Sequence, residues 1–591
     1  MREHGCPGAE TRCAAKRSEP RATATGHRAG SSGTSVATAD PHVAPMKRSC
    51  VPRSDRDAGS AQDHLVGTLL VIGLVLPVPA CLVGPDFVKP AVALNASWSE
   101  NRDPRLAVNA AAEIAWWKTF ADPTLDQLIE LAYRQSLSLQ IAGLRILEAR
   151  AQLGIAVGQQ YPTNPGPLAR AGVVKPSEHA AGSGGVNHHY GEYQTGFDAI
   201  WELDFWGKLR RGVRAANAAY LATVADYDGA LVSLSAEVAR TYVVIRTFEV
   251  LVDLARQNVR VQEEGQQIAE SRFRNGATSE LDVVQATNLL ESTRATIPVL
   301  EIGQRQAQNA LSTLLGRPTG YVQSLLGAPR GIPTPPARVA VSVPAEMLRR
   351  RPDIRGAELR AAAQCERIGI AKAELYPSFV LFGSIATQTT SGLGTSVLDA
   401  PRSSFTNLFG PGSLAYNAGG SLFWPILSYR QLRNGVRVED ARFQQALVEY
   451  VNTVLQAAQE VEDGMIGFLG QQDAAGFEQN AVTAAEASVR LALVQYREGA
   501  VDYQRVLDSQ RALLDSQNRL ASTRSEAVTD LIALYKALGG GWELRQGDPV
   551  VPAATEREMR DRTNWNGYFA KPPGPDAHAT EDPGGSLPSR K

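Results

Sequence analysis

Three features of this 591-residue chain contain residue types that could do chemistry: adjacent histidines, a glycine run and a few cysteines. His188 and His189 in "NHHY" could contact a metal ion or could equally be an exposed loop pair, and no further His or Cys has zinc-site spacing. The run Gly539–Gly541 is not followed by a phosphate-binding Lys-Ser/Thr, so it predicts the end of a helix. Five cysteines form no disulfide framework. The sequence therefore predicts no enzyme, no metal and no dissociable cofactor.

One cysteine does predict a modification. Cys81 ends the run "VPAC", with Ala80 directly before it and Val78 at the −3 position, which resembles a bacterial lipobox. Basic residues follow Met46, and the apolar run Leu65–Leu76 is too short to cross a bilayer of about 30 Å as a helix but suits a signal peptide. We therefore expect Cys81 to carry diacylglycerol and an N-terminal acyl chain; a retained membrane anchor is the alternative.

Composition limits the remaining possibilities. The formal net charge of −1 argues against a general nucleic-acid binder, which usually has a basic excess. Residues 1–45, rich in Gly, Ala, Ser, Thr, Arg and Pro, show no periodicity and are predicted to be disordered. The sequence leaves open whether translation starts at Met1 or Met46.

The chain repeats itself. "GIAVGQQYP" returns as "GIAKAELYP", and two further pairs of segments correspond at one constant offset. The pairs are 154–162 with 369–377, 206–220 with 429–443, and 272–287 with 495–510. The offset is 215 in the first pair and 223 in the other two, so the second copy carries eight extra residues between them. An unbroken offset of this length indicates internal duplication.

Each copy predicts a very long helix that turns back on itself. Residues 214–274 and 436–497 contain no proline, and at about 1.5 Å per residue each helix would run roughly 90 Å. Apolar residues recur at three- and four-residue spacing, which indicates packing like that of a coiled coil. Gly276 and Gly499 end the two helices, and a return helix follows each. Pro298 is expected to kink or divide the first return helix.

Before each long helix lies a region of strand character, about 167–206 in the first copy and about 377–427 in the second. Residues 192–206 alternate between aromatic or small residues and polar or acidic ones. A sandwich strand would alternate too, but acidic residues on one face with aromatic residues near both ends favour a membrane barrel with a wet interior. Four such strands cannot close, and open edges in lipid leave backbone groups unpaired. Two chains would give a filled eight-stranded barrel, and three would give twelve strands and room for a pore.

Six segments, in order, resemble one family. They are "CLVGPDFVKP" (81–90), "WWKTFADPTLDQLI" (116–129), "WELDFWGKLRR" (201–211), "LLGRP" (314–318), "RRRPDIRGAE" (349–358) and "LYKALGGGWE" (534–543). The chain from about Cys81 to Trp542 thereby resembles the TolC-like outer-membrane efflux channels of the OprM/NodT type, which serve resistance–nodulation–division pumps.

The resemblance implies an α+β membrane protein, internally duplicated, with four strands per chain in a trimeric twelve-stranded barrel and a long periplasmic helical barrel. It implies a lipid-anchored protein of the outer membrane that passes drugs or other small toxic compounds outward. The implied partners are two further copies, a periplasmic adaptor of the membrane fusion type, an inner-membrane transporter of the resistance–nodulation–division class and outer-membrane lipid.

The resemblance also assigns candidate functional residues. The hairpin tips "RFRNG" and "QYREG" make Arg274, Gly276, Arg497 and Gly499 candidates for contact with the adaptor. The family closes its channel just past the second tip.

At that constriction the matching residues here are Gln504, Asp508 and Arg511. An inward ring of Asp508 and Arg511 could pair between chains; a solvated helix face is the alternative. Gln504 stands where the family has an apolar residue, so a wetter seal is expected.

These observations divide the chain into six parts. They are 1–45 (disordered extension), 46–80 (signal peptide), 81–123 (lipid-anchored segment), 124–342 (first repeat), 343–547 (second repeat) and 548–591 (disordered tail). Three rival functions remain: a type I secretion duct, a metal-ion efflux duct and a periplasmic structural or adaptor coiled-coil protein. The sequence names neither the substrate nor the pump.

Overall fold

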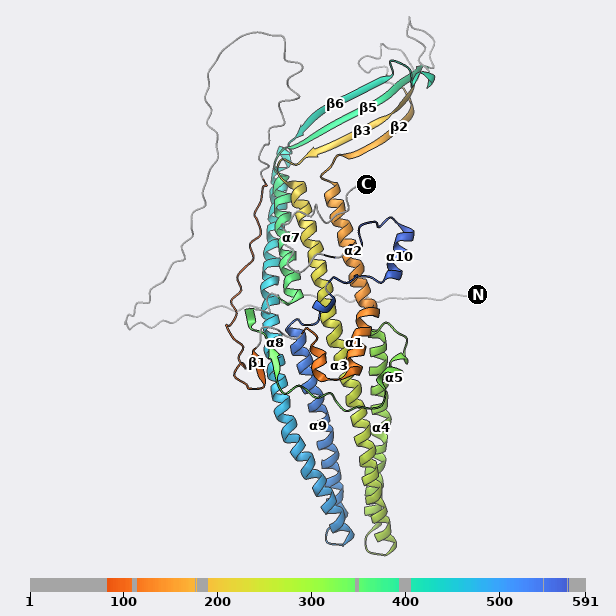
Figure 1. Cartoon of the computed structure of the whole chain (residues 1–591), viewed down its shortest axis with the longest axis vertical. Coiled ribbons are helices and arrows are strands. Elements are labelled where there is room, and N and C mark those ends of the chain that lie inside the picture. Colours follow the sequence, from red (N-terminus) through yellow and green to blue (C-terminus); the bar gives the residue numbers. More distant parts are fainter. Residues whose placement is uncertain are drawn as a thin grey trace, which may run out of the picture. The chain divides into compact units, whose positions relative to one another are not determined.

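The computed structural model describes residues 82–108, 114–175, 177, 190–345, 350–392, 405–545, 547–570 and 572, all within one unit, Pro77–Lys591 (Figure 1). The helices are α1 (Pro123–Gln135), α2 (Leu137–Gly158), α3 (Lys208–Arg274), α4 (Glu280–Leu314), α5 (Tyr321–Leu326), α7 (Pro352–Ala373), α8 (Tyr429–Arg497), α9 (Tyr503–Ala537) and α10 (Ala553–Arg562). The strands are β1 (Leu106–Val108), β2 (Thr163–Val174), β3 (Tyr190–Leu203), β4 (Val339–Val341), β5 (Ser378–Gly392) and β6 (Leu414–Phe423).

The two long helices are longer than the absence of proline indicated. α3 has 67 residues and α8 has 69, which corresponds to roughly 100 Å each at about 1.5 Å per residue. Each packs against its return helix, α4 or α9, as an antiparallel hairpin. Pro298 does not divide α4, which is continuous around it. Packing of α4 along α3 offsets the lost backbone hydrogen bond, which on an isolated helix would cost about 3 kcal/mol.

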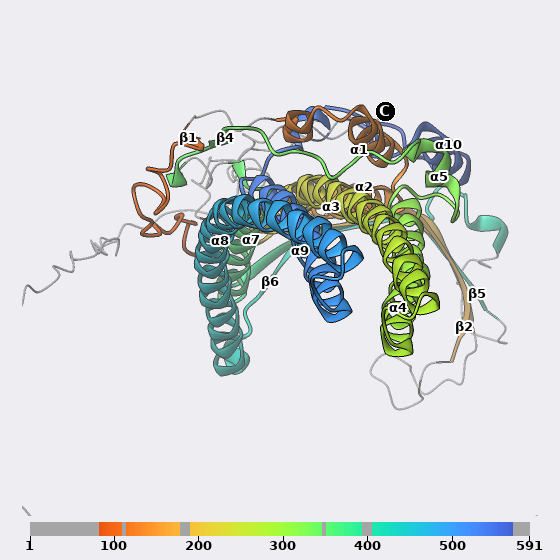
Figure 2. The same ribbon diagram turned by 90° about the horizontal axis from the view of Figure 1, so that it is seen from below.

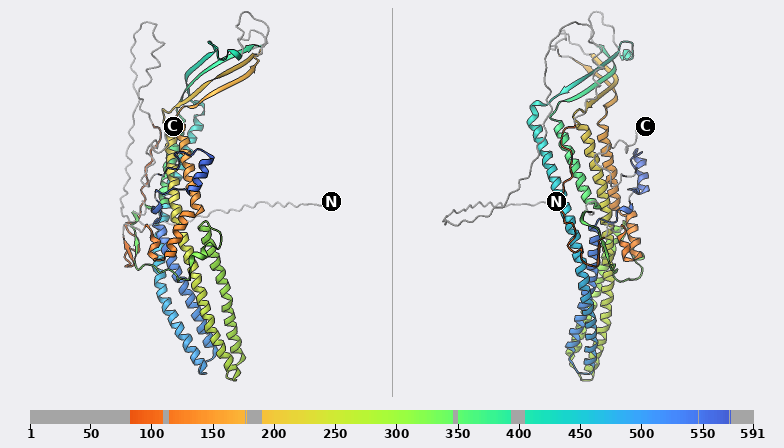
Figure 3. Two further views of the ribbon diagram at one scale, coloured as in Figure 1. Left: turned by 45° about the vertical axis from the view of Figure 1, so that its right-hand side comes forward. Right: turned by 60° about the vertical axis from the view of Figure 1, so that its left-hand side comes forward.

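The four long strands form one antiparallel sheet in the order β2-β3-β5-β6. The central pair, β3 and β5, joins the two copies of the duplication, with Tyr190 opposite Gly392 and Leu203 opposite Phe379. β2 and β6 are the outer strands of this sheet. Figure 3 shows the sheet beyond the end of α3 and α8 that lies opposite the hairpin turns. In the part of the chain that the structure describes, no helix has the length and apolar character needed to cross a membrane.

The duplicated Tyr-Pro segments lie where helix gives way to strand, and one contact marks both copies. The indole Nε1 of Trp201 donates to the carbonyl of Gln160 at 3.0 Å, and that of Trp424 donates to the carbonyl of Leu375 at 3.1 Å. In each copy the acceptor is the residue directly before the repeated tyrosine. The same bond at both junctions indicates that the two halves turn from helix to strand in one way.

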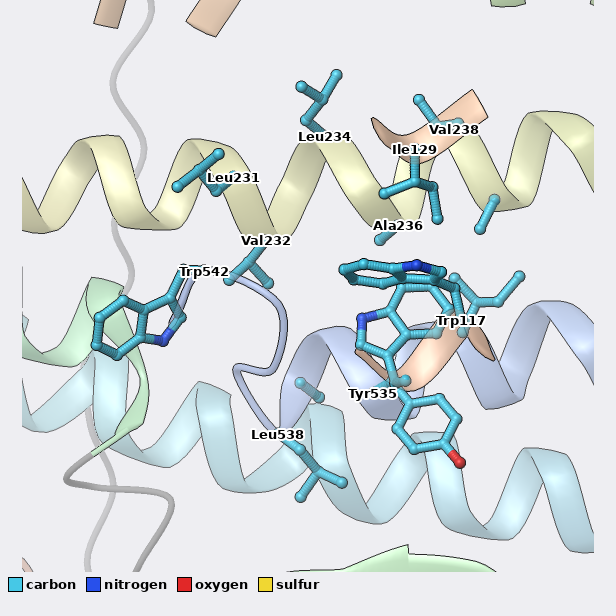
Figure 4. Packing of buried hydrophobic residues seen from close by; sticks show 14 of the residues in the cluster. Trp117, Ile129, Leu231, Val232, Leu234, Ala236, Val238, Tyr535, Leu538 and Trp542 are labelled. Atoms are coloured by element: carbon cyan, nitrogen blue, oxygen red, sulfur yellow. The ribbon is translucent and has the colours of Figure 1, made fainter. Parts of the chain in front are cut away.

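A buried aromatic cluster holds the helices together midway along α3. Trp116 is completely buried and stacks on Tyr535 with ring centroids 5.4 Å apart, while Trp117 meets Trp116 edge-on at 5.7 Å. Figure 4 shows Trp117 near Ala236 of α3 and Trp542 farther along the same helix, near Val232. The motifs "WWKTF" and "LYKALGGGW", which lie more than 400 residues apart, therefore build one core. Its burial favours association of α1, α3 and α9.

The tail differs from the prediction that residues 548–591 are disordered. α10 forms within it, and Val550, Tyr568 and Ala570 of the tail lie against α2. The guanidinium of Arg150 donates to the carbonyls of Tyr568 (3.0 Å) and Ala570 (2.7 Å). A Cβ on Gly143 would lie 2.0 Å from the carbonyl oxygen of Val550, so only glycine lets the tail approach α2 there. The prediction of disorder was wrong for this part, because the contacts that order it come from a distant helix and leave no local pattern in the sequence.

Candidate functional site

Both hairpins turn at a glycine with the same backbone geometry. At the first tip Gly276 has φ 68°, and the N–H of Ala277 donates to the carbonyl of Arg272 at 2.8 Å. At the second tip Gly499 has φ 78°, and the N–H of Ala500 makes the corresponding bond at 2.8 Å. These are Schellman endings, which favour glycine because other residues are strained at positive φ. The positive φ therefore explains why the residue at each predicted tip is glycine.

The two tip arginines are solvent-accessible but differ in their contacts. Arg274 is exposed at the last turn of α3. Arg497 is also exposed and forms a 3.3 Å ion pair with Glu264 of α3. An exposed pair of this kind contributes little to stability, about 0–1 kcal/mol. Both side chains are therefore accessible to a partner protein.

Gln504, Asp508 and Arg511 lie on one exposed face of α9, as their four- and three-residue spacing requires. Within one copy, the Gln504 amide Nε2 donates to Asp508 Oδ1 at 2.8 Å. Among the described residues of one copy, no ion pair joins Asp508 to Arg511. The opposite face of α9 is buried against the other helices. The three residues are thus presented outward from the hairpin, where groups of another copy could meet them.

Sequence reasoning missed the residue that connects the two tips. The guanidinium of Arg272 lies 4.8 Å from the ring centroid of Tyr496 and donates to the carbonyls of Tyr496 and, at 3.3 Å, Arg497. These carbonyls end α8, where a cation is favourable. The hydroxyl of Tyr496 donates to Asp282 Oδ2 at 3.0 Å. The only sequence signal was that the aligned second-copy residue is Gln495 rather than Arg.

A small apolar core lies behind these contacts. It combines residues of both hairpins, among them Ala269, Leu289, Leu493 and Leu507. The rings of Tyr496 and Tyr503 meet at 5.0 Å, and burial raises the pKa of both phenols above the usual range. Both tyrosines therefore stay protonated near neutral pH, which lets Tyr496 donate its hydrogen bond to Asp282.

We expect Arg272→Gln, which copies the residue at the matching place in the second hairpin, to loosen the tips. Loss of the ring contact and the charge-assisted hydrogen bonds would cost about 1–3 kcal/mol. Hydrogen exchange of the amides around Gly499, followed by mass spectrometry, is expected to accelerate by roughly 5- to 100-fold. Arg274→Gln, two residues along and exposed, is the control. Equal exchange in the two variants would contradict this role of Arg272.

A second cluster fixes the N-terminal segment where β3 meets α3. Arg211 is 1% exposed, and its guanidinium pairs with Glu366 of α7 at 2.7 Å, donates to the Pro85 carbonyl at 3.0 Å and lies 3.3 Å from Asp86. Gly369 leaves room for it, because a Cβ there would lie 2.0 Å from Arg211 Cδ. The buried guanidinium therefore connects three separate stretches of the chain.

The first residues of this segment lie at the junction of strand and helix. The N–H of Val83 donates to the carbonyl of Trp206 at 3.2 Å, and a Cβ on Gly207 would lie 2.6 Å from Leu82 Cδ2. Cys81 itself lies outside the described residues, as do the predicted signal peptide (46–80) and the His188–His189 pair. Among the residues that are described, no group of three or more potential metal ligands occurs.

Asp228, partly buried on α3, makes stability depend on pH. Burial raises its pKa from 3.8 to about 7; the cation of Arg355 opposes this rise and the carboxylate of Glu543 adds to it. Between these pH values the folded protein holds a proton that the unfolded chain has released, so stability falls as pH rises from about 4 to about 7.

Asp228→Asn is therefore expected to raise the free energy of unfolding at pH 8 by about 1–4 kcal/mol, and to have little effect at pH 4. Thermal unfolding followed by tryptophan fluorescence at both pH values checks this. Asp226→Asn, at an exposed neighbour on the same helix, serves as the control. A gain of the same size at both pH values would contradict the assignment.

A family model and the sequences of known proteins match most of the chain. Residues 128–317 and 343–540 match the family model described as outer membrane efflux protein. Nodulation protein T of Rhizobium leguminosarum biovar viciae is 29% identical over 504 residues, which cover 85% of this chain and 98% of that protein. The pyoverdine export outer membrane protein OpmQ of Pseudomonas putida is 29% identical over 485 residues, covering 80% and 97%.

Solved structures agree with this result. The outer-membrane channel OprN superposes with a TM-score of 0.71 at 30% identity, covering 78% of this chain and all of that one. The outer membrane channel CmeC of Campylobacter jejuni gives the same TM-score at 20% identity, covering 82% and 98%, and so supports the fold alone.

Proposed function

The chain belongs to the outer membrane efflux protein family, and from that premise we propose that three copies of it form the outer-membrane duct of a three-part pump. The protein is an efflux channel of the outer membrane that extends into the periplasm. In the proposed assembly an inner-membrane transporter of the resistance–nodulation–division class and a periplasmic adaptor deliver small toxic compounds to it. No catalytic step is assigned to it, because the transporter supplies the energy.

The observation that carries the proposal is the open four-stranded sheet joined to two long hairpins. β2 and β6 are its outer strands, and an unpaired edge in lipid would leave backbone groups unsatisfied at several kcal/mol each. Pairing β6 of one copy with β2 of the next removes every edge. Three copies give twelve strands and a lumen, whereas the interior of an eight-stranded barrel is filled by side chains.

The helices support the same assembly. α8 and α4 lie at opposite ends of the row of long helices in Figure 2. Both carry large exposed apolar side chains at helical spacing, a feature that marks interaction surfaces. On α8 these are Val448, Leu455, Ile466, Phe477 and Leu491; on α4 they are Leu281, Val284, Val299 and Ile302. Phe477 is the most exposed of these side chains, at 76%. Contact of α8 with α4 of the next copy would bury both stripes.

The two ends of the hairpins have separate proposed roles. The exposed tip arginines, Arg274 and Arg497, are offered to the adaptor, with Gly276 and Gly499 shaping the turns. The face of α9 that bears Gln504, Asp508 and Arg511 would turn toward the channel axis and close it. Both roles rest on the family match and on the exposure of these side chains in a single copy.

The proposal is tested with the purified full-length protein. We expect a heat-modifiable trimer in the outer-membrane fraction, single-channel currents in planar bilayers, and co-purification with an adaptor and a transporter. A monomeric protein in the soluble periplasmic fraction would contradict the proposal. Co-purification with a transporter of the type I secretion class would indicate that the protein serves a secretion system rather than a drug pump.

The lipid anchor has its own test. Leu82 and Val83 lie at the junction of β3 and α3, so the neighbouring Cys81 is expected at the level of the inner leaflet. Cys81→Ser should abolish incorporation of labelled palmitate in growing cells. Cys365→Ala removes a buried free cysteine and should keep the label. Equal labelling of the two variants would exclude Cys81 as the acylated residue.

A further inference from the structure

The helices nearest the sheet follow the order of its strands. β3 leads into α3, α7 leads into β5, and α3 packs along α7 just as β3 pairs with β5. In the same way, β6 leads into α8 and α2 leads into β2. Pairing of β6 with β2 of the next copy, as in the proposed trimer, therefore brings α8 of one subunit beside α2 of the partner subunit. The α3–α7 joint within one chain is thus a template for the α8–α2 joint between subunits.

The duplication relates the two joints residue by residue. α2 and α7 have 22 residues each, and the offset of 215 maps one onto the other from end to end. The offset of 223 brings the ends of α3 and α8 into register. An ion pair of the template keeps its charges under this mapping. Arg360 of α7 pairs with Asp226 of α3. The corresponding residues are Arg145 of α2 and Glu449 of α8, which are both exposed in a single copy.

Within one chain, the N-terminal segment seals the α3–α7 joint. The side chain of Arg211 of α3 reaches over Gly369 of α7, where a Cβ would lie 2.0 Å from Arg211 Cδ. Its guanidinium donates to the carbonyl of Pro85 at 3.0 Å, and the thiol of Cys365 donates to the same carbonyl at 3.6 Å. A Cβ on Gly84 would lie 2.6 Å from Gly369 Cα. The segment therefore contacts both helices of the joint.

The C-terminal tail lies on the corresponding positions of α2. The offset of 215 maps Cys365 and Gly369 onto Arg150 and Gly154. Arg150 donates to two carbonyls of the tail, one of them that of Tyr568 at 3.0 Å. A Cβ on Gly154 would lie 2.7 Å from the hydroxyl oxygen of Tyr568. The tail thus lies on the first copy where the N-terminal segment lies on the second.

The two segments also correspond farther from the sheet. Lys89 of the N-terminal segment lies over the ring of Tyr450 of α8, 5.9 Å from its centroid. The offset of 223 maps Tyr450 onto Tyr227 of α3, which lines a cavity together with Val550 of the tail. The tail therefore follows the path of the N-terminal segment with the opposite chain direction. Two segments without related sequences occupy equivalent grooves.

The joint between subunits lacks the buried ion pair of the template. The offset of 223 puts Asn434 of the partner subunit where Arg211 stands, and the offset of 215 puts Ala151 where Glu366 stands. The amide is shorter than the guanidinium, and alanine offers no carboxylate. On α2 the hydroxyl of Tyr568 lies over the small residue instead. The tail thus supplies the side chain that the partner's helix does not.

We propose that residues 565–570 of the tail form a clamp between subunits, in which Tyr568 reaches from α2 to α8 of the partner subunit and bonds Asn434 there. In a single copy Asn434 is exposed, and its Oδ1 accepts from Arg437 at 3.0 Å. The amide Nδ2 of Asn434 can then donate to the phenol oxygen. This inference rests on the trimer of the proposed function and adds a role for the tail. The tail follows the region that matches the family, which ends at residue 540.

Two cysteine pairs test the clamp and the trimer separately. In full-length protein that carries Cys365→Ala, Tyr568→Cys with Asn434→Cys tests the clamp, and Arg145→Cys with Glu449→Cys tests the joint without the tail. Mild oxidation with copper phenanthroline should join chains on a non-reducing denaturing gel for both pairs, and dithiothreitol should separate them. Variants with only Tyr568→Cys or only Asn434→Cys are the controls and should give no joined chains.

The two pairs separate failure of the clamp from failure of the trimer. Joined chains from the Arg145 and Glu449 pair alone overturn the clamp and leave the proposed channel standing. Joined chains from neither pair mark failure of the trimer arrangement and overturn the inference with it. Joined chains from the Tyr568 and Asn434 pair alone, or from a single-cysteine control, would mean that the tail meets a neighbour outside this joint, which also overturns the clamp.

A second set of variants measures the clamp without cysteines. Tyr568→Phe removes only the hydroxyl, and the heat-modifiable trimer should then dissociate about fivefold faster or more at a fixed temperature. Asn566→Ala, at an exposed residue two positions away, is the control and should leave the rate unchanged.

Adding Asn434→Arg and Ala151→Glu to Tyr568→Phe copies the buried ion pair of the α3–α7 joint into the joint between subunits. This triple variant should recover most of the lost trimer lifetime. An unchanged rate in Tyr568→Phe would overturn the clamp. A lifetime that stays short in the triple variant would place the effect of Tyr568 within its own chain and overturn the clamp as well.

Discussion

Asp508→Ala is expected to raise the single-channel conductance of the trimer at least about twofold. In one copy Asp508 accepts a hydrogen bond from Gln504 at 2.8 Å but has no ion pair with Arg511 among the described residues, so both charges are available to a neighbouring copy. Around a three-fold axis they can form a closed ring of charges, the kind of constriction that sets conductance in pores. Removing the carboxylate breaks every pair of the ring at once.

Two further variants make this result specific. Asp515→Ala removes a carboxylate two turns along the same helix that is already paired with Arg519 in its own chain, so conductance should stay unchanged. The exchange Asp508→Arg with Arg511→Asp restores the pairing with charges reversed and should return conductance toward that of the natural protein. If Asp515→Ala opened the channel as much as Asp508→Ala, the constriction would not lie at Asp508.

Arg211→Met is expected to destabilise the trimer strongly. The guanidinium is 1% exposed and pairs with a carboxylate that is 8% exposed, so its loss leaves Glu366 buried without its cation. Breaking a buried pair in this way costs about 3–5 kcal/mol in each chain. The temperature at which the heat-modifiable trimer dissociates should fall, and the segment that follows Cys81 should become sensitive to protease.

The adjacent residue offers a matched control for this variant. Arg210 is about one third exposed and pairs with Asp204, so Arg210→Met should lower the dissociation temperature much less. Arg211→Met combined with Glu366→Met should recover much of the lost stability, because two apolar side chains replace a buried ion pair. A double variant as unstable as Arg211→Met would show that the effect comes from packing rather than from an unpaired charge.

Local patterns predicted much of this fold from the sequence. The long helices follow from periodic apolar residues without proline, and the strands follow from alternation. Gly276 and Gly499 were recognisable because a turn at positive φ favours glycine wherever it occurs. The constant offset between the copies predicted the two equivalent hairpins before any contact was known. Each of these signals lies within a short stretch of residues.

Contacts between segments that are distant along the chain have no such local pattern in the sequence. Arg272 sits in a helix rich in charged residues, and nothing near it indicates that the end of α8 lies against it. The packing of the tail on α2 depends likewise on Gly143 and Arg150, about 400 residues upstream. The candidate gate residues lie on one exposed face as their spacing required, but the ion pairs proposed for Asp508 and Arg511 are with another copy. Spacing within one chain cannot name those partners.

The order of the strands constrains how the protein acquires its structure. β3 pairs with β2, its neighbour in sequence, and also with β5, which lies much farther along the chain. Between β3 and β5 the chain builds the α3–α4 hairpin and α7. Pairings this distant along the chain form slowly, because the intervening loop must close first. The helices of the first copy can therefore pack before the central strands meet. Synthesis must reach β6 before a chain can offer both sheet edges to its neighbours, so the barrel closes last. A chain truncated in its second copy could therefore not complete the membrane barrel.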